Sequence, residues 1–414
     1  MSQSSALAPF RVRSFRFQWP ADLTTSWAFE METLILGWYV LVETQSVFML
    51  TVFASLQYLG TLIAPLLGVA SDRVGHRTIL ASMRATYAVL ASILMTLALT
   101  GVLVPVHVFC IAPLMGLIRP SDMGMRAALV GDTVPAMHFL QAMSIERTTS
   151  DSARIAGALT GAGIVAAFGM GPAFVAITAL YLTSFCLTLQ VGLRGRREPH
   201  GGASAALSPF AELKDAARYV WARPVLLGTL SIAFLVNFCA YPLVQSLLPY
   251  VAKDIYHTDQ IGLGYLVAGF ASGALVGSII LSRRAGMISP ARMMIIGCSL
   301  WYVMIAVFAQ MTTPVMGIAA LFLAGLAQSL GMVSMGTLIL RNTEARYRGR
   351  IMGLRMMAIY GVPLGLLLSG PLISHLGYPL TASLYSALGI GCIVLVALRW
   401  REHLWRRDAP ANSR

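Results

Sequence analysis

Charged residues are scarce in this chain, and their scarcity narrows the class of protein. Only 11% of the 414 residues are charged, whereas 57% are hydrophobic, and the mean hydropathy is +0.73. A soluble globular chain carries about 25% charged residues. This composition excludes a soluble enzyme and indicates a chain that lies mostly within a lipid bilayer.

Residues that build metal and catalytic sites are also few. The five cysteines stand singly in apolar runs, as small buried side chains do, at Cys110, Cys186, Cys239, Cys298 and Cys392. The seven histidines are dispersed, so no His/Cys cluster has the spacing of a metal site. The phosphate-binding motif G-x-x-x-x-G-K-[ST] and the nucleophile motif G-x-S-x-G are both absent. We therefore expect no metal, cofactor or catalytic residue. An ion gradient would supply the energy, and protons suit buried carboxylates.

Positive charge gathers in every second connection between the apolar runs. These basic connections lie at residues 11–16, 73–77, 194–197, 283–284, 341–350 and 399–407, and only Lys253 breaks the alternation. Cytoplasmic loops of membrane proteins carry such an excess of bases. The formal net charge of +13 thus predicts cytoplasmic termini and a lipid partner, and it does not indicate nucleic-acid binding.

Twelve apolar runs are long enough to cross a bilayer, since one crossing needs about 20 mostly apolar residues. We predict an all-α polytopic membrane protein with 12 transmembrane helices in two six-helix bundles. The predicted parts are an N-terminal bundle (1–193), a cytoplasmic linker (194–224), a C-terminal bundle (225–398) and a basic cytoplasmic tail (399–414). Six helices, a polar linker and six helices are typical of an internal duplication.

Three local features have more detailed predictions. Pro20 and Asp22 are start signals for a first helix that would run from about Asp22 to Val42. The preceding segment Phe10–Trp19 mixes arginine with aromatics and is expected along the inner membrane face. The linker segment Pro209–Trp221 is expected to form an amphipathic helix on the same face.

One short stretch between two apolar runs carries a recognisable motif, Gly68-Val-Ala-Ser-Asp72-Arg73-Val-Gly75-His-Arg77. It resembles the loop between transmembrane helices 2 and 3 of the major facilitator superfamily, G-x-L-a-D-r-x-G-r-r. The matching residues are Gly68, Asp72, Arg73, Gly75 and Arg77; Ala70 replaces the usual Leu, and His76 a base. The resemblance implies two six-helix halves that rock about a central pore.

Three further segments resemble one branch of that superfamily, the enterobactin-exporter and macrolide-efflux branch of bacterial drug/proton antiporters. They are Phe15-Arg16-x-x-Trp19, Leu36-Gly-Trp38 and Ser152-Ala-Arg154-Ile-Ala-Gly157. The resemblance implies that Asp72 docks near residues 350–353 and locks the state closed to the cytoplasm. It also implies that Arg73 or Arg77 pairs with Asp132.

The first candidate site consists of Glu30 and Glu32 in the first predicted helix. A rise of 1.5 Å per residue from Asp22 places them about 12–15 Å deep, near the middle of the bilayer. Acids at that depth mark proton relays and substrate paths, although a structural carboxylate bonded to a neighbouring helix is the alternative. Residues two apart point about 200° apart on a helix. Only one of the two can therefore face a central cavity squarely, and the sequence favours neither.

The second candidate site lies in the cytoplasmic half of the fourth and fifth predicted helices. Arg119, Asp122 and Arg126 form one stripe of alternating charge, and Arg147, Asp151 and Arg154 form another. With Asp132 and Glu146 the set holds four bases and four acids. Such self-neutralising charges favour a structural or gating network, while the deeper Arg119 is also a candidate for binding substrate. The small residues from Gly157 to Gly163 allow close helix packing.

The third candidate site is uncharged. Asn237, Tyr241 and Gln245 recur every four residues in the seventh predicted helix, with Pro242 as a possible bend, and Gln328 lies in the tenth. Polar faces of this kind line the cavity of a transporter, and interhelical hydrogen bonds explain them about equally well.

Together these features predict a secondary transporter, not an enzyme. We expect proton-coupled efflux of a small amphipathic compound, such as a drug, siderophore or metabolite, by a monomer in a bacterial inner membrane. Two alternatives stay open. One is uptake of a nutrient or organic anion, with Arg119 as the counter-charge, and the other is a transporter-like sensor that moves nothing.

Overall fold

The computed structural model describes residues 8–61, 71, 74–192, 209–283, 289–344 and 347–401. Throughout these residues the regular elements are helices, and none is a strand. The all-α prediction is therefore confirmed. The chain divides into two compact units. Unit 1 contains Met1–Gly202 and Ala252–Ala268, and unit 2 contains Ala203–Val251 and Gly269–Arg414.

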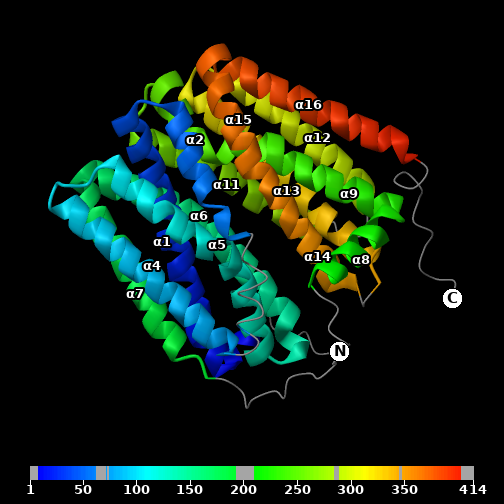
Figure 1. Cartoon of the computed structure of the whole chain (residues 1–414), viewed down its shortest axis with the longest axis horizontal. Coiled ribbons are helices and arrows are strands. Elements are labelled where there is room, and N and C mark those ends of the chain that lie inside the picture. The colour runs from blue at the N-terminus through cyan, green and yellow to red at the C-terminus, as the bar shows by residue number, and fades with distance from the viewer. Residues whose placement is uncertain are drawn as a thin grey trace. The chain divides into compact units, whose positions relative to one another are not determined.

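Unit 1 is built mainly from long helices. They are α1 (Arg13–Thr44), α4 (His76–Leu99), α5 (Pro105–Thr133), α6 (Ala136–Phe168) and α7 (Met170–Leu189), with the shorter α2 (Val47–Leu56) and a 3-10 turn (Leu59–Thr61) between the first two. α1 packs along α6 and α7, and α4 runs beside α7 (Figure 1). α1 thus contacts most of the other helices of its unit, so residues on different sides of α1 meet different neighbours.

The start of α1 differs from the prediction. The helix begins at Arg13 and continues through Pro20, so Asp22 lies well inside it. Phe15 is fully buried, and the segment Phe10–Trp19 packs on an apolar cluster formed by Val130, Val134 and Ala142. Its position along the inner membrane face stays a prediction. Proline favours helix starts and disfavours helix interiors, but here the burial of aromatic side chains outweighs that preference.

Unit 2 contains the remaining helices. They are α8 (Pro209–Trp221), α9 (Pro224–Leu235), α10 (Leu248–Tyr250), α12 (Pro290–Ala309), α13 (Pro314–Arg341), α14 (Arg348–Met357), α15 (Gly361–Leu376) and α16 (Tyr378–Arg399). Residues of α11 (Gln260–Arg283) fall in both units. α12 packs along α13 and α16, and Figure 1 shows α12 and α16 running side by side.

Two predicted helices of unit 2 are irregular. Beyond α9 the chain continues through π-helical turns at Val236–Ala240, Pro242–Ser246 and Val251–Ile255. Pro242 has no N–H to donate, and proline and π turns are common causes of irregularity in a helix. A 3-10 turn at Ala358–Tyr360 likewise separates α14 from α15. Continuous spans were predicted here, at about Val225–Val251 and at about Ile351–Leu376.

The predicted linker helix is present as α8, and its apolar side is buried at Ala216 and Val220. Its polar side bonds to the start of α14, because Asp215 accepts from Arg350 at 3.1 Å and the ring of Tyr219 stacks on Tyr347. α8 thus packs on α14 and α9, while its position on a membrane surface stays a prediction.

Within the described residues, eight helices are long and apolar enough to cross a membrane. α1, α5 and α6 are equally long, with 32, 29 and 33 residues, but they carry more charged side chains. Such a chain is a multi-pass membrane protein. The number of 12 spans and the cytoplasmic termini stay predictions.

Candidate functional site

Two groups of mostly buried charged side chains project from the long helices of unit 1. We call the first the Glu32 pocket; its charged and amide side chains are those of Glu32, Gln57 and Arg119. We call the second the Asp22 cluster; it consists of Asp22, Arg84, Asp122, Arg126 and Glu146. Because a charge inside a transmembrane helix is costly unless it is paired or used, the pairing of each group decides what the site can do.

Glu32 is the buried acid of the first site, with 1% of its surface exposed. Its Oε2 accepts from Arg119 Nη2 at 3.2 Å and from the Tyr181 hydroxyl at 2.8 Å. Its Oε1 is buried and has no hydrogen-bond partner among the described residues. One carboxylate oxygen is thus available to accept a proton or a donor from a ligand.

Arg119 is more fully occupied than Glu32. Its Nη1 donates to the side chain of Gln57, and its Nη2 also lies 3.3 Å from the carbonyl oxygen of Phe29. The guanidinium lies over the Phe29 ring, 3.1 Å from the ring centroid. Arg119 therefore contacts α1 and Gln57, the residue that follows α2, and it does not continue the predicted stripe with Asp122. An organic anion would have to displace these partners to reach it.

The Glu32 pocket has apolar walls. Glu32, Gln57 and Arg119 line a small cavity in unit 1 together with Thr33, Leu36, Phe53, Ile111, Ala112 and Met115. The arrangement combines one acidic acceptor, its paired base and a flexible methionine with aliphatic and aromatic surface. Such a lining suits a ligand with both an apolar body and a polar or cationic group.

Glu30 lies on another side of α1, as the 200° separation predicts. Its Oε1 is 3.3 Å from Nε of Arg154 on α6, and both side chains are partly exposed. The two helices approach closely here, because a Cβ at Gly157 would lie 2.7 Å from the Glu30 Cβ and 3.0 Å from the Trp27 carbonyl oxygen. Gly157 therefore serves helix packing, as its small-residue motif predicts.

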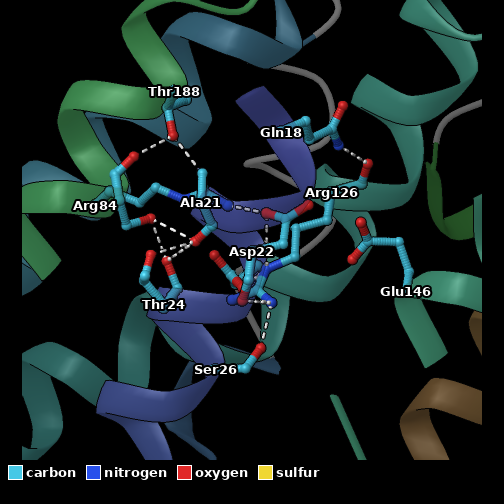
Figure 2. A network of polar contacts seen from close by, with 12 residues as sticks. Gln18, Ala21, Asp22, Thr24, Ser26, Arg84, Arg126, Glu146 and Thr188 are labelled. Atoms are coloured by element: carbon cyan, nitrogen blue, oxygen red, sulfur yellow. Dashed lines mark hydrogen bonds and ion pairs between the residues drawn. The ribbon is translucent and has the colours of Figure 1, made fainter. Parts of the chain in front are cut away.

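The Asp22 cluster is the most deeply buried charged group in the described part of unit 1. Neither Asp22 nor Arg84 is exposed, and they form an ion pair between α1 and α4. Arg84 also donates to the Thr188 hydroxyl on α7. Nε of Arg126 lies 2.5 Å from Asp122 and 3.6 Å from Asp22. Figure 2 shows how these side chains converge on Asp22.

Neither Asp22 nor Arg84 was predicted as a functional residue. Asp22 was interpreted as a helix start signal, whereas Arg84 in the third predicted span was passed over. A signal was present nonetheless, since a lone arginine inside an apolar helix is expensive and requires a partner. The structure supplies that partner on α1.

Residues of the predicted gating network are only partly described. Gly68, Asp72 and Arg73 lie outside the described residues, and the docking of Asp72 stays a prediction. The carboxylate of Asp132 lies 2.7 Å from His76 Nδ1, while Arg77 donates to the carbonyl oxygen of Leu189. Arg77 is thus not the partner of Asp132 in this structure. Gly75 has a φ of +100°, which favours glycine.

The second predicted charge stripe also separates into different contacts. Arg147 and Asp151 form an ion pair along α6 at 3.2 Å, and the arginine side chain is 63% exposed. Arg154 reaches across to Glu30 on α1 instead. The stripe on α5 behaves alike, because Asp122 pairs with Arg126 while Arg119 turns to Glu32. In each stripe, helix spacing therefore predicts one ion pair correctly, and the remaining residue of the stripe pairs with α1 instead.

The uncharged candidates belong to unit 2. Asn237 donates to the carbonyl oxygen of Ala233 within its own helix, at 2.7 Å. Tyr241 accepts from Gln328 of α13 at 3.0 Å and packs edge-on against Trp301. The bond between Gln328 and Tyr241 is interhelical, whereas the bond of Asn237 lies within one helix. Gln245 lies in the π turn after Pro242 and is partly buried.

Comparison with known proteins agrees with this architecture. The family model described as Major Facilitator Superfamily matches residues 23–362 and again residues 243–413. No curated protein sequence matches the chain.

Solved transporter structures share the fold at low sequence identity. The chain resembles the nucleoside transporter NupG with a TM-score of 0.70 and 13% identity, covering 96% of this chain and 100% of that one. It resembles an auto-inhibited peptide transporter of the POT family with a TM-score of 0.73 and 13% identity, over 97% and 99% of the two chains. A bacterial homologue of the human lysosomal transporter Spinster has a TM-score of 0.71 and 13% identity, over 99% and 100%.

These structural similarities show the fold, and sequence identities this low do not indicate the transported substrate. Since the family model covers most of the chain and the helices are those of a multi-pass membrane protein, the chain belongs to the major facilitator superfamily and is a transporter, not an enzyme.

Proposed function

We propose that this protein is a secondary active transporter that exports a small amphipathic compound in exchange for protons. The observation that carries the proposal is the Glu32 pocket. There a buried carboxylate keeps one oxygen that has no hydrogen-bond partner in the described part of the chain, beside apolar walls. A carboxylate can be charged or neutral, so the proton and the ligand can both bind to this one group.

Competition at Glu32 explains how the exchange would work. When Glu32 is ionised, it pairs with Arg119 and offers its second oxygen to a cationic or hydrogen-bond-donating ligand. A proton on Glu32 removes that acceptor charge and weakens its attraction for such a ligand. Proton and ligand would therefore bind alternately, as antiport requires.

The same geometry is less favourable to the uptake of an organic anion. Arg119 is held by Glu32, Gln57 and the Phe29 ring, so its positive charge is already neutralised. Resemblance to the enterobactin-exporter and macrolide-efflux branch, stated above on three segments, supports the outward direction. A bacterial inner membrane and a monomeric state belong to the same proposal.

Substitution of the two acids of α1 tests the proposal, because they have different surroundings on one helix. In everted vesicles with a proton gradient, Glu32→Gln is expected to lower proton release coupled to the cationic dye ethidium by at least about tenfold, since a hydrogen bond to a charged group contributes about 1.5–3 kcal/mol. The matched control Glu30→Gln, whose partner is Arg154, is expected to retain most of the coupling. Gradient collapse is followed with a pH-sensitive fluorophore.

Other outcomes would overturn the proposal. If Glu32→Gln couples ethidium to protons as the wild type does, the pocket is not the coupling site. Proton-coupled movement of the anionic dye fluorescein without any response to ethidium would favour the anion transporter. Binding of either dye with no flux would favour the sensor.

A further inference from the structure

The Asp22 cluster contains more acids than bases. Its acids are Asp22, Asp122 and Glu146, and its bases are Arg84 and Arg126, so one carboxylate has no base of its own. All five side chains lie within the helices of unit 1, and Asp22 and Arg84 have no exposed surface. Burying an unbalanced charge is far more costly than burying a pair. The cluster can lower this cost by holding a proton.

Glu146 is the acid left over. Arg84 and Arg126 are both paired with Asp22, and Asp122 is paired with Arg126 at 2.5 Å. The Glu146 residue is only 8% exposed, and its side chain forms no ion pair with any described residue. Its buried Oε1 has no hydrogen-bond partner among the described residues. In Figure 2 its carboxylate points from α6 toward the side chains of Asp22 and Arg126.

Charged groups on three other helices act on Glu146. Asp22 of α1 repels the ionised form of Glu146, whereas Arg126 of α5 and Arg84 of α4 attract it. Both arginines are already shared with Asp22. A proton between the two carboxyl groups, Glu146 and Asp22, relieves their repulsion and leaves the arginine pairs intact.

We propose that Glu146, together with Asp22, forms a proton-binding site of this transporter that is separate from the Glu32 pocket. A proton from the aqueous phase forms an O–H bond on the Glu146 carboxylate, and its loss returns the charge. Ionised Glu146 competes with Asp22 for Arg126, whose contact with Asp22 is the longer of its two, at 3.6 Å against 2.5 Å. The proton thus controls how firmly α5 is held to α1.

The role of this site in transport rests on the proposed proton coupling, but its chemistry can be measured without transport. Infrared spectroscopy of the purified full chain detects the carbonyl stretch of a protonated carboxyl group. Glu146→Gln is expected to remove the equivalent of one such carboxyl at neutral pH, and in the wild type that signal should disappear as the pH rises. Glu43→Gln, at an exposed position of α1, is the matched control and is expected to leave the signal unchanged.

The outcomes separate this inference from the proposed function. An unchanged carboxyl signal in Glu146→Gln overturns the proton site, even if Glu32→Gln abolishes coupling in vesicles. Loss of the signal in Glu32→Gln alone also overturns the proton site at Glu146, and it assigns the proton to the Glu32 pocket. If Glu146→Gln removes the signal and vesicles show no proton coupling, the site stands and the function proposed above fails. If Glu146→Gln folds poorly, Glu146→Asp is used in its place. This variant keeps a carboxyl group and is expected to keep the signal.

Discussion

Arg84→Met is expected to destabilise the protein by about 3–5 kcal/mol, because removing one partner leaves the other as an uncompensated buried charge. Arg84 and Asp22 have no exposed surface. Without Arg84 the Asp22 cluster holds three acids against the single base Arg126. We expect the melting temperature of the detergent-solubilised protein to fall by several degrees. Intrinsic fluorescence measures this temperature.

A double substitution separates lost pairing from lost packing. Arg84→Met combined with Asp22→Asn removes one base and one acid, so the excess of acid returns to its original value of one. The double variant is therefore expected to be more stable than the sum of the two single effects indicates. Additive effects would show that the pair contributes no coupling energy and would contradict the assignment.

The ion pair between Arg147 and Asp151 on α6 gives a control for the loss of an arginine. The Arg147 side chain is 63% exposed, whereas that of Asp151 is 8% exposed, so solvent screens this pair from the arginine side. Fully exposed pairs contribute about 0–1 kcal/mol, and completely buried ones cost about 3–5 kcal/mol when one partner is removed. Arg147→Gln is therefore expected to lower the melting temperature less than Arg84→Met does.

Gly273→Ala is the second substitution with a large expected effect. A Cβ at Gly273 of α11 would lie 1.9 Å from the Phe322 carbonyl oxygen of α13, and one at Gly325 of α13 would lie 2.0 Å from the Phe270 carbonyl oxygen of α11. Each helix thus uses a glycine to contact the backbone of the other, as small residues allow in membrane proteins. Because backbone atoms cannot rotate away as a side chain does, the two helices must separate to admit one methyl group.

We expect Gly273→Ala to cost at least as much as typical overpacking, about 1–3 kcal/mol, and Gly325→Ala to behave alike. The measurement is the yield of monodisperse protein by fluorescence-detected size exclusion, with the melting temperature. Gly391→Ala of α16 is the control in the same unit, since a Cβ there meets no atom within 4 Å. Alanine is the better helix former by about 0.5–1 kcal/mol, so the control should be at least as stable as the wild type. Equal behaviour of the Gly273 and Gly391 variants would contradict the close approach of α11 and α13.

Prediction from the sequence succeeded where the signal is local. The helix of the linker at Pro209–Trp221 follows from its amphipathic spacing, and the separation of Glu30 from Glu32 follows from the helical turn. The beginning of α1 was wrong because Pro20 and Asp22 are common start signals. Burial of Phe15 overrides that signal, and it depends on residues more than 100 positions away in α5 and α6.

The composition and motifs of this chain determined by themselves that it is an all-helical membrane protein of the transporter superfamily, since hydropathy, basic connections and the Gly68–Arg77 turn are properties of neighbouring residues. Only the tertiary structure decided which acid pairs with which base. The ion pairs are Glu32 with Arg119, Glu30 with Arg154, and Asp22 with Arg84. They form because α1, α4, α5 and α6 pack so that the two partners lie at the same level along their helices. Helix spacing limits pairing to residues three or four apart, whereas pairing across helices depends on how the helices pack, and packing is set by the whole unit.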